Sequence, residues 1–225
     1  GLGATIFSEK TGPISYNGLS AAFAGHIHLN QAWRLSIGAS LEILNYRLDP
    51  SAITFLEAND VAISSTSTSL ILPSMNAGFA LYTKGFFLAG ATRQLLQNRI
   101  QINSQNPYVS GLEVHYLIQS GFRVELSEDF QFTPSLALRF RSPAAPSWEL
   151  SLRARIKDFF YIGASYRHQD AITGLMGLNI NHMLSLYYAY DFTTSTLRKN
   201  SAGTHSLVLN LRIEHAASSI RQYFW

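Results

Sequence analysis

Cysteine is absent from the 225 residues, which excludes disulfide bonds, thiolate metal sites and a small secreted scaffold held together by disulfides. Charged residues are scarce: Asp, Glu, Lys and Arg make up 14% of the chain, against about 25% in typical soluble domains. Long hydrophobic runs are missing, since no apolar stretch reaches the roughly 18 residues that a membrane helix needs. These absences argue against an ordinary soluble domain and against a helical membrane protein.

The start of the chain also lacks a feature, because no basic segment followed by an apolar stretch opens it. Residues 1–7 instead have the composition of the middle of a strand. We therefore expect further residues before Gly1.

A strong positive charge is absent too. The sequence pI is near 9.2, but the net charge is only +3 and the arginines are spread singly along the chain. Nucleic-acid binding requires a clustered basic surface, so we expect no nucleic-acid partner.

Alternation of apolar and polar residues is what the chain has in abundance, most clearly over residues 130–157. Eleven positions on one face of this stretch carry no charge, while the other face carries six charged residues. A period of two places each set on one face of a strand. Two strands of this kind joined by a short polar connection are typical of a transmembrane β-hairpin.

The same pattern predicts twelve strands. We place them at residues 2–8, 19–29, 33–46, 75–83, 86–95, 113–126, 130–141, 148–156, 159–168, 171–180, 183–192 and 205–214. They form one domain over residues 1–225, because all-β barrels often exceed 200 residues as a single unit. A short helix within the connection at residues 51–59 is also expected.

Short and long connections are predicted to alternate along the chain. The short ones are 30–32, 83–85, 127–129, 157–158 and 181–182, and the longer ones are 9–18, 47–73, 96–112, 142–147, 169–170 and 193–204. Transmembrane barrels have this asymmetry, with short periplasmic turns and long external loops. The C-terminus is then periplasmic.

The apolar face is predicted to meet lipid, because a barrel of twelve or more strands is too wide for its side chains to fill the lumen. Aromatic residues near strand ends are predicted to form girdles at the membrane surface. These are Trp33, Trp148, Phe159, Phe160, Tyr161, Tyr187 and Tyr190.

Two groups of residues are candidates for function. The first consists of strand charges that line the lumen, either as cross-strand ion pairs or as pore-lining groups: Arg123, Glu125, Arg139, Arg141, Glu149, Arg153, Arg155 and Arg212. The second lies in the two longest external loops, whose apolar residues suggest docking or plugging. Its members are Ile53, Phe55, Leu56, Leu70, Ile71, Leu72, Asn106 and Tyr108.

Other chemistry finds little support. His26 and His28 have a chelating spacing, but no third ligand lies nearby in the sequence, so we predict no metal and no other cofactor. The remaining histidines of strands and turns, His115, His168, His182 and His205, have no serine motif beside them. We predict no catalytic residues.

Several stretches, in order along nearly the whole chain, resemble the PorP/SprF family of outer-membrane proteins tied to type IX secretion and gliding motility. They are Gly1–Pro13, Leu126–Leu136, Phe160–Arg167 with Gly174–Ile180, Tyr188–Thr193 and Gly203–Leu207. Members usually carry a signal peptide and opening strands that are absent here, so the complete protein is expected to have fourteen strands. The aromatic end, Tyr223–Trp225, resembles an outer-membrane assembly signal but trails the last predicted strand.

The resemblance implies a non-enzymatic barrel of the bacterial outer membrane. Such proteins bind, anchor or help export a secreted surface protein, an adhesin, through its C-terminal sorting domain. Other expected partners are further secretion components, the lipid bilayer and lipopolysaccharide. From the residues alone, a diffusion porin or hydrophobic-solute transporter is the alternative.

Overall fold

The computed structural model describes residues 1–49, 68–101, 109–181, 183–199 and 203–211. Its elements are β1 (Leu2–Thr11), β2 (Ile14–His28), β3 (Arg34–Leu48), β4 (Thr68–Tyr82), β5 (Phe86–Arg93), β6 (Arg99–Gln101), β7 (Val109–Gly111), β8 (His115–Phe122), β9 (Val124–Ser127), β10 (Phe130–Arg141), β11 (Ala144–Ile156), β12 (Phe160–Arg167), β13 (Ala171–Asn179), β14 (Leu184–Thr193), the 3₁₀ turn η2 (Thr196–Lys199) and β15 (Thr204–Leu211). The predicted helix at 51–59 lies outside the described residues.

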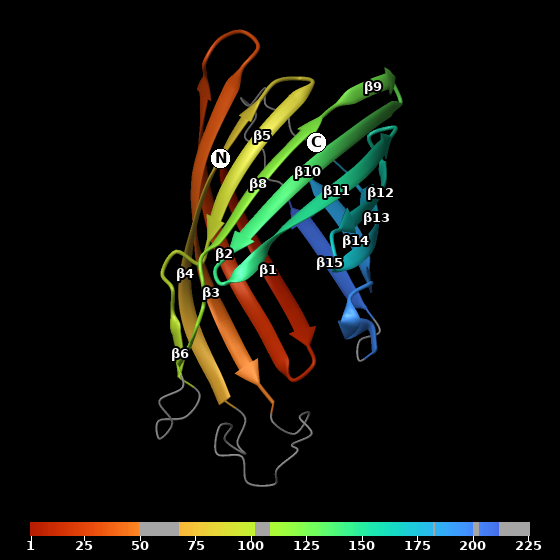
Figure 1. The fold of residues 1–225 in the computed structure, drawn as a ribbon. Helices are drawn as coiled ribbons and strands as arrows, with labels where there is room; N and C mark the ends of the chain where they lie inside the picture. The colour runs from red at the N-terminus through yellow and green to blue at the C-terminus, as the bar shows by residue number, and fades with distance from the viewer. Residues whose placement is uncertain (50–67, 102–108, 182, 200–202, 212–225) are drawn as a thin grey trace. The chain divides into compact units, whose positions relative to one another are not determined.

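The strands are antiparallel and follow one another in the sheet in chain order. The path is β1-β2-β3-β4-β5-β8-β10-β11-β12-β13-β14-β15, and β9 pairs with β10 beside it (Figure 1). The predicted fold class is confirmed: the protein is an all-β, up-and-down antiparallel barrel with twelve strands along the path of the sheet. In the described parts of the chain, no helix is long and apolar enough to cross a membrane.

The chain forms two compact units. Unit 1 comprises Gly1–Ala24, Gly38–Gly78 and Thr92–His115, and unit 2 comprises Gly25–Ile37, Phe79–Ala91 and Tyr116–Trp225. Strands β2 to β5 contribute residues to both units.

The first hairpin is tighter than predicted. β1 and β2 pair from Leu2↔Phe23 to Thr11↔Ile14, so the turn is Gly12-Pro13 and the predicted long connection at 9–18 is wrong. Gly12 has a φ of +57°, a conformation that glycine adopts without strain, and Pro13 has no N–H that would need a partner. The polar residues around the turn hid the strand alternation that continues through it.

The connection between β10 and β11 is likewise short. Arg141 pairs with Ala144 across a turn at residues 142–143, so the predicted longer connection at 142–147 is also wrong. The register shifts between Arg139 and Arg141, and this irregularity lets the strand that contains Pro146 pair with β10. The predicted loop at 96–112 contains a small separate sheet, β6 with β7.

Short and long connections therefore do not alternate strictly along the chain. The three long connections, residues 49–67, 94–114 and 194–203, follow the third, fifth and eleventh strands of the path. In an antiparallel sheet, connections after odd-numbered strands all lie at the same end of the strands. The connections after the first, seventh and ninth strands lie at that end too and are short.

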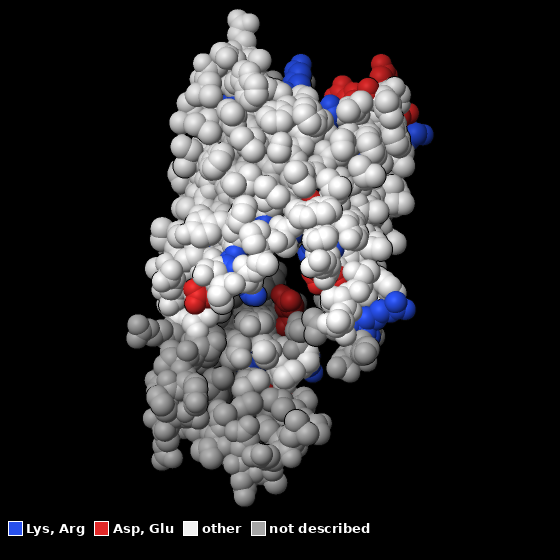
Figure 2. All heavy atoms as spheres, viewed as in Figure 1, with Lys and Arg blue, Asp and Glu red and all other residues white. Residues whose placement is uncertain are grey.

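The sheet of unit 2 has an apolar face and a polar face. On the apolar face, Leu136, Leu150 and Leu152 are 41%, 51% and 52% exposed. Their neighbours in register, among them Tyr166 and Ile172, extend the same apolar surface across β12 and β13. Figure 2 shows broad areas without charged side chains, with the charges gathered in a few places.

The polar face carries the alternate positions of the same strands. In register across β10 to β14 it presents the rows Ser135, Ser151, Ser165, Thr173, Asp191 and Ala137, Glu149, Arg167, Ala171, Thr193. Exposed leucines on one face and partly buried charges on the other are the reverse of a soluble barrel.

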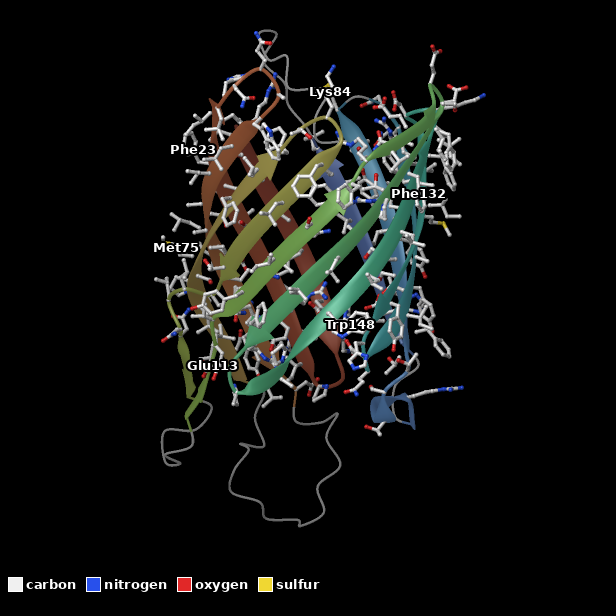
Figure 3. The ribbon with its side chains drawn as sticks, turned by 45° about the horizontal axis from the view of Figure 1, so that its top comes forward. Phe23, Met75, Lys84, Glu113, Phe132 and Trp148 are labelled. Carbon is white, nitrogen blue, oxygen red and sulfur yellow. The ribbon has the colours of Figure 1, made fainter. Side chains whose placement is uncertain are left out.

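Unit 1 contains the largest buried apolar cluster that the structure describes. Leu44, Tyr46, Leu48 and Leu72 form it, with Phe7, Ile14, Tyr16, Leu70 and Leu112 packed against them. The opposite face of the same strands is again exposed and apolar, with Leu41, Ile43 and Ile71. In Figure 3, Phe23 and Met75, also exposed residues of unit 1, point away from their strands.

Candidate functional site

A network of ion pairs lies on the polar face of β10 to β14. The Glu149 carboxylate lies 2.8 Å from Nη1 of Arg139 and accepts a hydrogen bond of 3.0 Å from Nε of Arg167. Arg167 also pairs with Asp170 at 3.0 Å and with Asp191 at 3.5 Å. The Glu149 side chain is 12% exposed, so the carboxylate at the centre of the network is largely withdrawn from water.

Two hydroxyl side chains, one on β13 and one on β11, extend this network. The Thr173 hydroxyl donates to Asp191 at 2.7 Å, and Ser151 donates to Glu149 at 3.3 Å. The members of the network come from β10 to β14 and from the turn that follows β12. The network therefore holds several strands in one register.

A separate pocket on the polar face of unit 2 has a volume of about 260 Å³. Its lining includes Arg123, Arg153 and Arg155, together with amide and hydroxyl groups, and contains no carboxylate among the described residues. Nη2 of Arg155 donates to Oε1 of Gln131 at 2.6 Å, and its Nη1 lies 2.8 Å from Asp158. Nη1 of Arg123 donates to the Lys84 carbonyl at 3.2 Å (Lys84 is labelled at the β4–β5 turn in Figure 3).

Two tyrosines pack against each other at the pocket, and one of them lines it. Tyr161 is 5% exposed and lines the pocket, and its ring centroid lies 5.7 Å from that of Tyr187. The Tyr187 ring covers Gly177, so that any Cβ at position 177 would collide with it. Tyr161 and Tyr187 were predicted to belong to membrane-surface girdles, and for these two residues the prediction is wrong.

The other aromatic clusters lie on the apolar face at opposite strand ends of unit 2. Trp33 packs edge-on against Phe86, whose ring lies 5.3 Å from that of Phe122. At the other end, Trp148 packs against Tyr166 at 5.7 Å and stacks on His168 at 4.9 Å (Trp148 is labelled in Figure 3).

The predicted lumen charges fall into three groups. Arg123, Arg153 and Arg155 share the pocket, and Arg139 and Glu149 share the ion-pair network. Glu125 and Arg141 are exposed, and Arg212 lies outside the described residues. Arg167, Asp170 and Asp191 were not among the predicted charges, although the alternation of β12 places Arg167 in phase with Tyr161.

The predicted docking residues divide between the loop and a strand. Leu70, Ile71 and Leu72 belong to β4, so their assignment to an external loop is wrong. Leu72 is buried in the unit 1 cluster, while Ile71 is 74% exposed on the apolar face. The remaining five, Ile53, Phe55, Leu56, Asn106 and Tyr108, lie outside the described residues.

Unit 1 holds a buried polar group that was also not predicted from the sequence. Glu42 is buried and accepts a 2.9 Å hydrogen bond from Nδ2 of Asn76, whose Oδ1 accepts from the backbone N–H of Gln94 at 3.0 Å. This arrangement ties β3, β4 and the end of β5 together.

The histidines are not gathered into a site. His26 lies 3.5 Å from the Tyr82 hydroxyl, and His205 bonds to the Tyr188 hydroxyl at 2.7 Å. Among the described residues, no group of three or more His, Asp or Glu side chains could hold a metal ion. His182 lies outside the described residues.

An antiparallel barrel with an exposed apolar face, aromatic clusters at both strand ends and ion pairs on the opposite face belongs to the class of membrane β-barrels. The chain matches the family described as type IX secretion system membrane protein PorP/SprF over residues 1–211. It belongs to that family, and it is therefore a membrane component of type IX secretion. The family is one of secretion-system membrane proteins, a non-enzymatic kind. No curated protein matches the chain.

Proposed function

We propose that the protein is an outer-membrane barrel that binds a secreted surface protein, an adhesin, through its C-terminal sorting domain and anchors it or helps to export it. Membership of the type IX secretion family over residues 1–211 is the observation that carries this proposal. In this role the protein performs no catalysis and serves surface attachment and gliding, with other components of the secretion system as partners.

We place the apolar face against the lipid and lipopolysaccharide of the outer membrane and the polar face toward the lumen. The exposed leucines of β10 and β11 support this placement. A charged residue in the middle of a bilayer costs about 2–4 kcal/mol, and the positions that share the apolar face with these leucines on β10 and β11 carry no charge. On the opposite face, charged side chains form the ion-pair network and line the pocket, as expected for a lumen; they include Arg139, Glu149, Arg167, Arg123, Arg153 and Arg155.

The long connections supply the external docking surface in this proposal. Residues 49–67 and 94–114 follow the third and fifth strands of the path, which run in the same direction, so both connections begin at the same end of the sheet. Long external loops are typical of such barrels. In this proposal β15, the last strand of the path, runs toward the periplasm, so that the C-terminus is periplasmic. Leu72 is excluded from the docking surface because it is buried.

Affinity isolation from native membranes tests the proposal. The tagged protein should co-isolate a secreted protein that carries a C-terminal sorting domain. Replacing residues 50–67 with a short Gly-Ser linker, which leaves β3 and β4 intact, should reduce recovery of that protein severalfold. Lys84→Ser is the matched control, because Lys84 lies in a short turn at the opposite end of the strands; this variant should leave recovery unchanged.

Equal recovery with and without residues 50–67 would contradict the docking surface. Steady open-channel currents from the purified barrel in planar bilayers, combined with failure to isolate any secreted protein, would favour a diffusion porin or hydrophobic-solute transporter.

A further inference from the structure

We propose that Arg123, Arg153 and Arg155 form a binding site for a small free oxyanion of the phosphate or carboxylate class on the polar face of unit 2. This site goes beyond the docking of a secreted protein and does not depend on it. Its donors come from the end of β8 and from β11, and Gln119, Gln131 and Thr133 add uncharged polar groups to the same pocket.

The chemistry of the lining selects oxyanions. A guanidinium presents five N–H donors in a planar fork that matches the two oxygens of a carboxylate or phosphate. Three such groups surround a cavity of about 260 Å³, a volume that holds a phosphate and its remaining water ligands. The described lining offers a metal cation no carboxylate ligand.

The carboxylates near the pocket arginines lie outside its described lining. Arg123 is repelled by Arg153 and Arg155 and attracted by Glu125, an exposed residue that lies opposite Gln131 in the β9–β10 pairing. Asp158 pairs with Arg155 at 2.8 Å, but the aspartate side chain is 78% exposed and such pairs are weak. An oxyanion between the guanidiniums would remove their mutual repulsion.

The acidic residues of the ion-pair network are too far away to serve this pocket. Glu149 precedes Arg153 by four residues and Arg155 by six on the same strand. At about 3.3 Å per residue these separations are roughly 13 and 20 Å. Asp170 and Asp191 are held by Arg167 in the same network.

Phosphate is the probe for the test. The full-length barrel, purified in detergent, should bind inorganic phosphate saturably in a calorimetric titration at constant ionic strength, with sodium chloride as the reference salt. Arg153→Gln combined with Arg155→Gln should weaken binding by about tenfold or more, because two of the three charged donors are lost. Arg141→Gln, an exposed arginine at the far end of β10, should leave binding unchanged.

Folding is checked by the heat-modifiable migration that intact barrels show in electrophoresis. If the double variant does not fold, Arg153→Lys provides the second test: it keeps the charge, removes the planar fork and should weaken binding severalfold.

Three results would overturn the proposal. They are the absence of saturable phosphate binding, binding by the folded double variant or the lysine variant that equals that of the unaltered protein, and an equal loss in Arg141→Gln, which would mean general screening. A further titration uses short-chain phosphatidylglycerol below its critical micelle concentration in place of phosphate. Arginine-dependent binding tighter than that of phosphate would assign the site to a lipid headgroup and overturn the free-anion assignment.

Discussion

Glu149 is the residue on which the ion pairs of the polar face converge. Among the described residues, it is the carboxylate that forms an ion pair with Arg139, and it shares Arg167 with Asp170 and Asp191. Breaking a buried pair leaves an uncompensated charge, but here Arg139 and Arg167 are 40% and 25% exposed, so water screens part of the loss.

We predict that Glu149→Gln lowers the free energy of unfolding by about 1–3 kcal/mol. Urea-induced unfolding of the barrel in lipid vesicles measures this change. Glu128→Gln, in the exposed turn before β10, is the matched control and should change stability by less than about 0.5 kcal/mol. Equal stability of the two variants would show that the network contributes nothing.

At the residue scale, alternation in the sequence predicted the face of each strand charge but not its partner. Arg153 and Arg155 could be placed on the polar face from spacing alone. Their pocket also includes Tyr82, from a strand more than seventy residues earlier, which the sequence does not bring to β11. Predicting cross-strand partners such as Glu149 and Arg167 requires the register of the strands, and the register depends on the lengths of the turns.

β11 shows what the two faces require of an element. Leu152 lies near the middle of the strand on the apolar face, and Ser151 lies beside it on the polar face. Introducing the same side chain at each of these two adjacent positions therefore compares the proposed lipid-facing position 152 with the proposed lumen-facing position 151.

We predict that Leu152→Arg destabilises the folded barrel by about 2–4 kcal/mol, because it places a charge in the hydrocarbon. Ser151→Arg should cost less than about 1 kcal/mol, because the polar face can hydrate an additional guanidinium. Equilibrium unfolding in vesicles of a defined lipid gives both values. A larger loss for Ser151→Arg would reverse the assignment of the faces.

β4 explains why sequence reasoning failed at particular elements. Leu70, Ile71 and Leu72 are three successive apolar residues, and they broke the period of two on which strand prediction rests. The structure places Ile71 on the exposed apolar face, while Leu70 and Leu72 pack with Leu44 and Tyr46. The inward face of unit 1 is therefore apolar at this point, and alternation of polarity carries no signal there.

The aromatic clusters at the two strand ends define a property of the whole molecule, its position along the membrane normal. Trp33 and Trp148 lie in these clusters at opposite strand ends of unit 2. Amphipathic rings of this kind settle at the level of the lipid headgroups.

We predict that both tryptophans are quenched more strongly by lipids brominated near the headgroup end of the acyl chain than by lipids brominated near the chain terminus. The measurement uses single-tryptophan proteins, made with Trp225→Phe together with either Trp33→Phe or Trp148→Phe. Strongest quenching of either residue by the chain-terminal bromines would place that cluster inside the hydrocarbon and contradict the girdle.

Along the path of the sheet, the strands follow one another in the order of the chain from the first to the last, and most neighbours are joined directly. Contacts of short sequence separation form early and with little loss of chain entropy. The barrel can consequently be assembled hairpin by hairpin, each strand arriving at the bilayer with one edge of its backbone already paired. Only the other edge then needs a partner before hydrocarbon surrounds it.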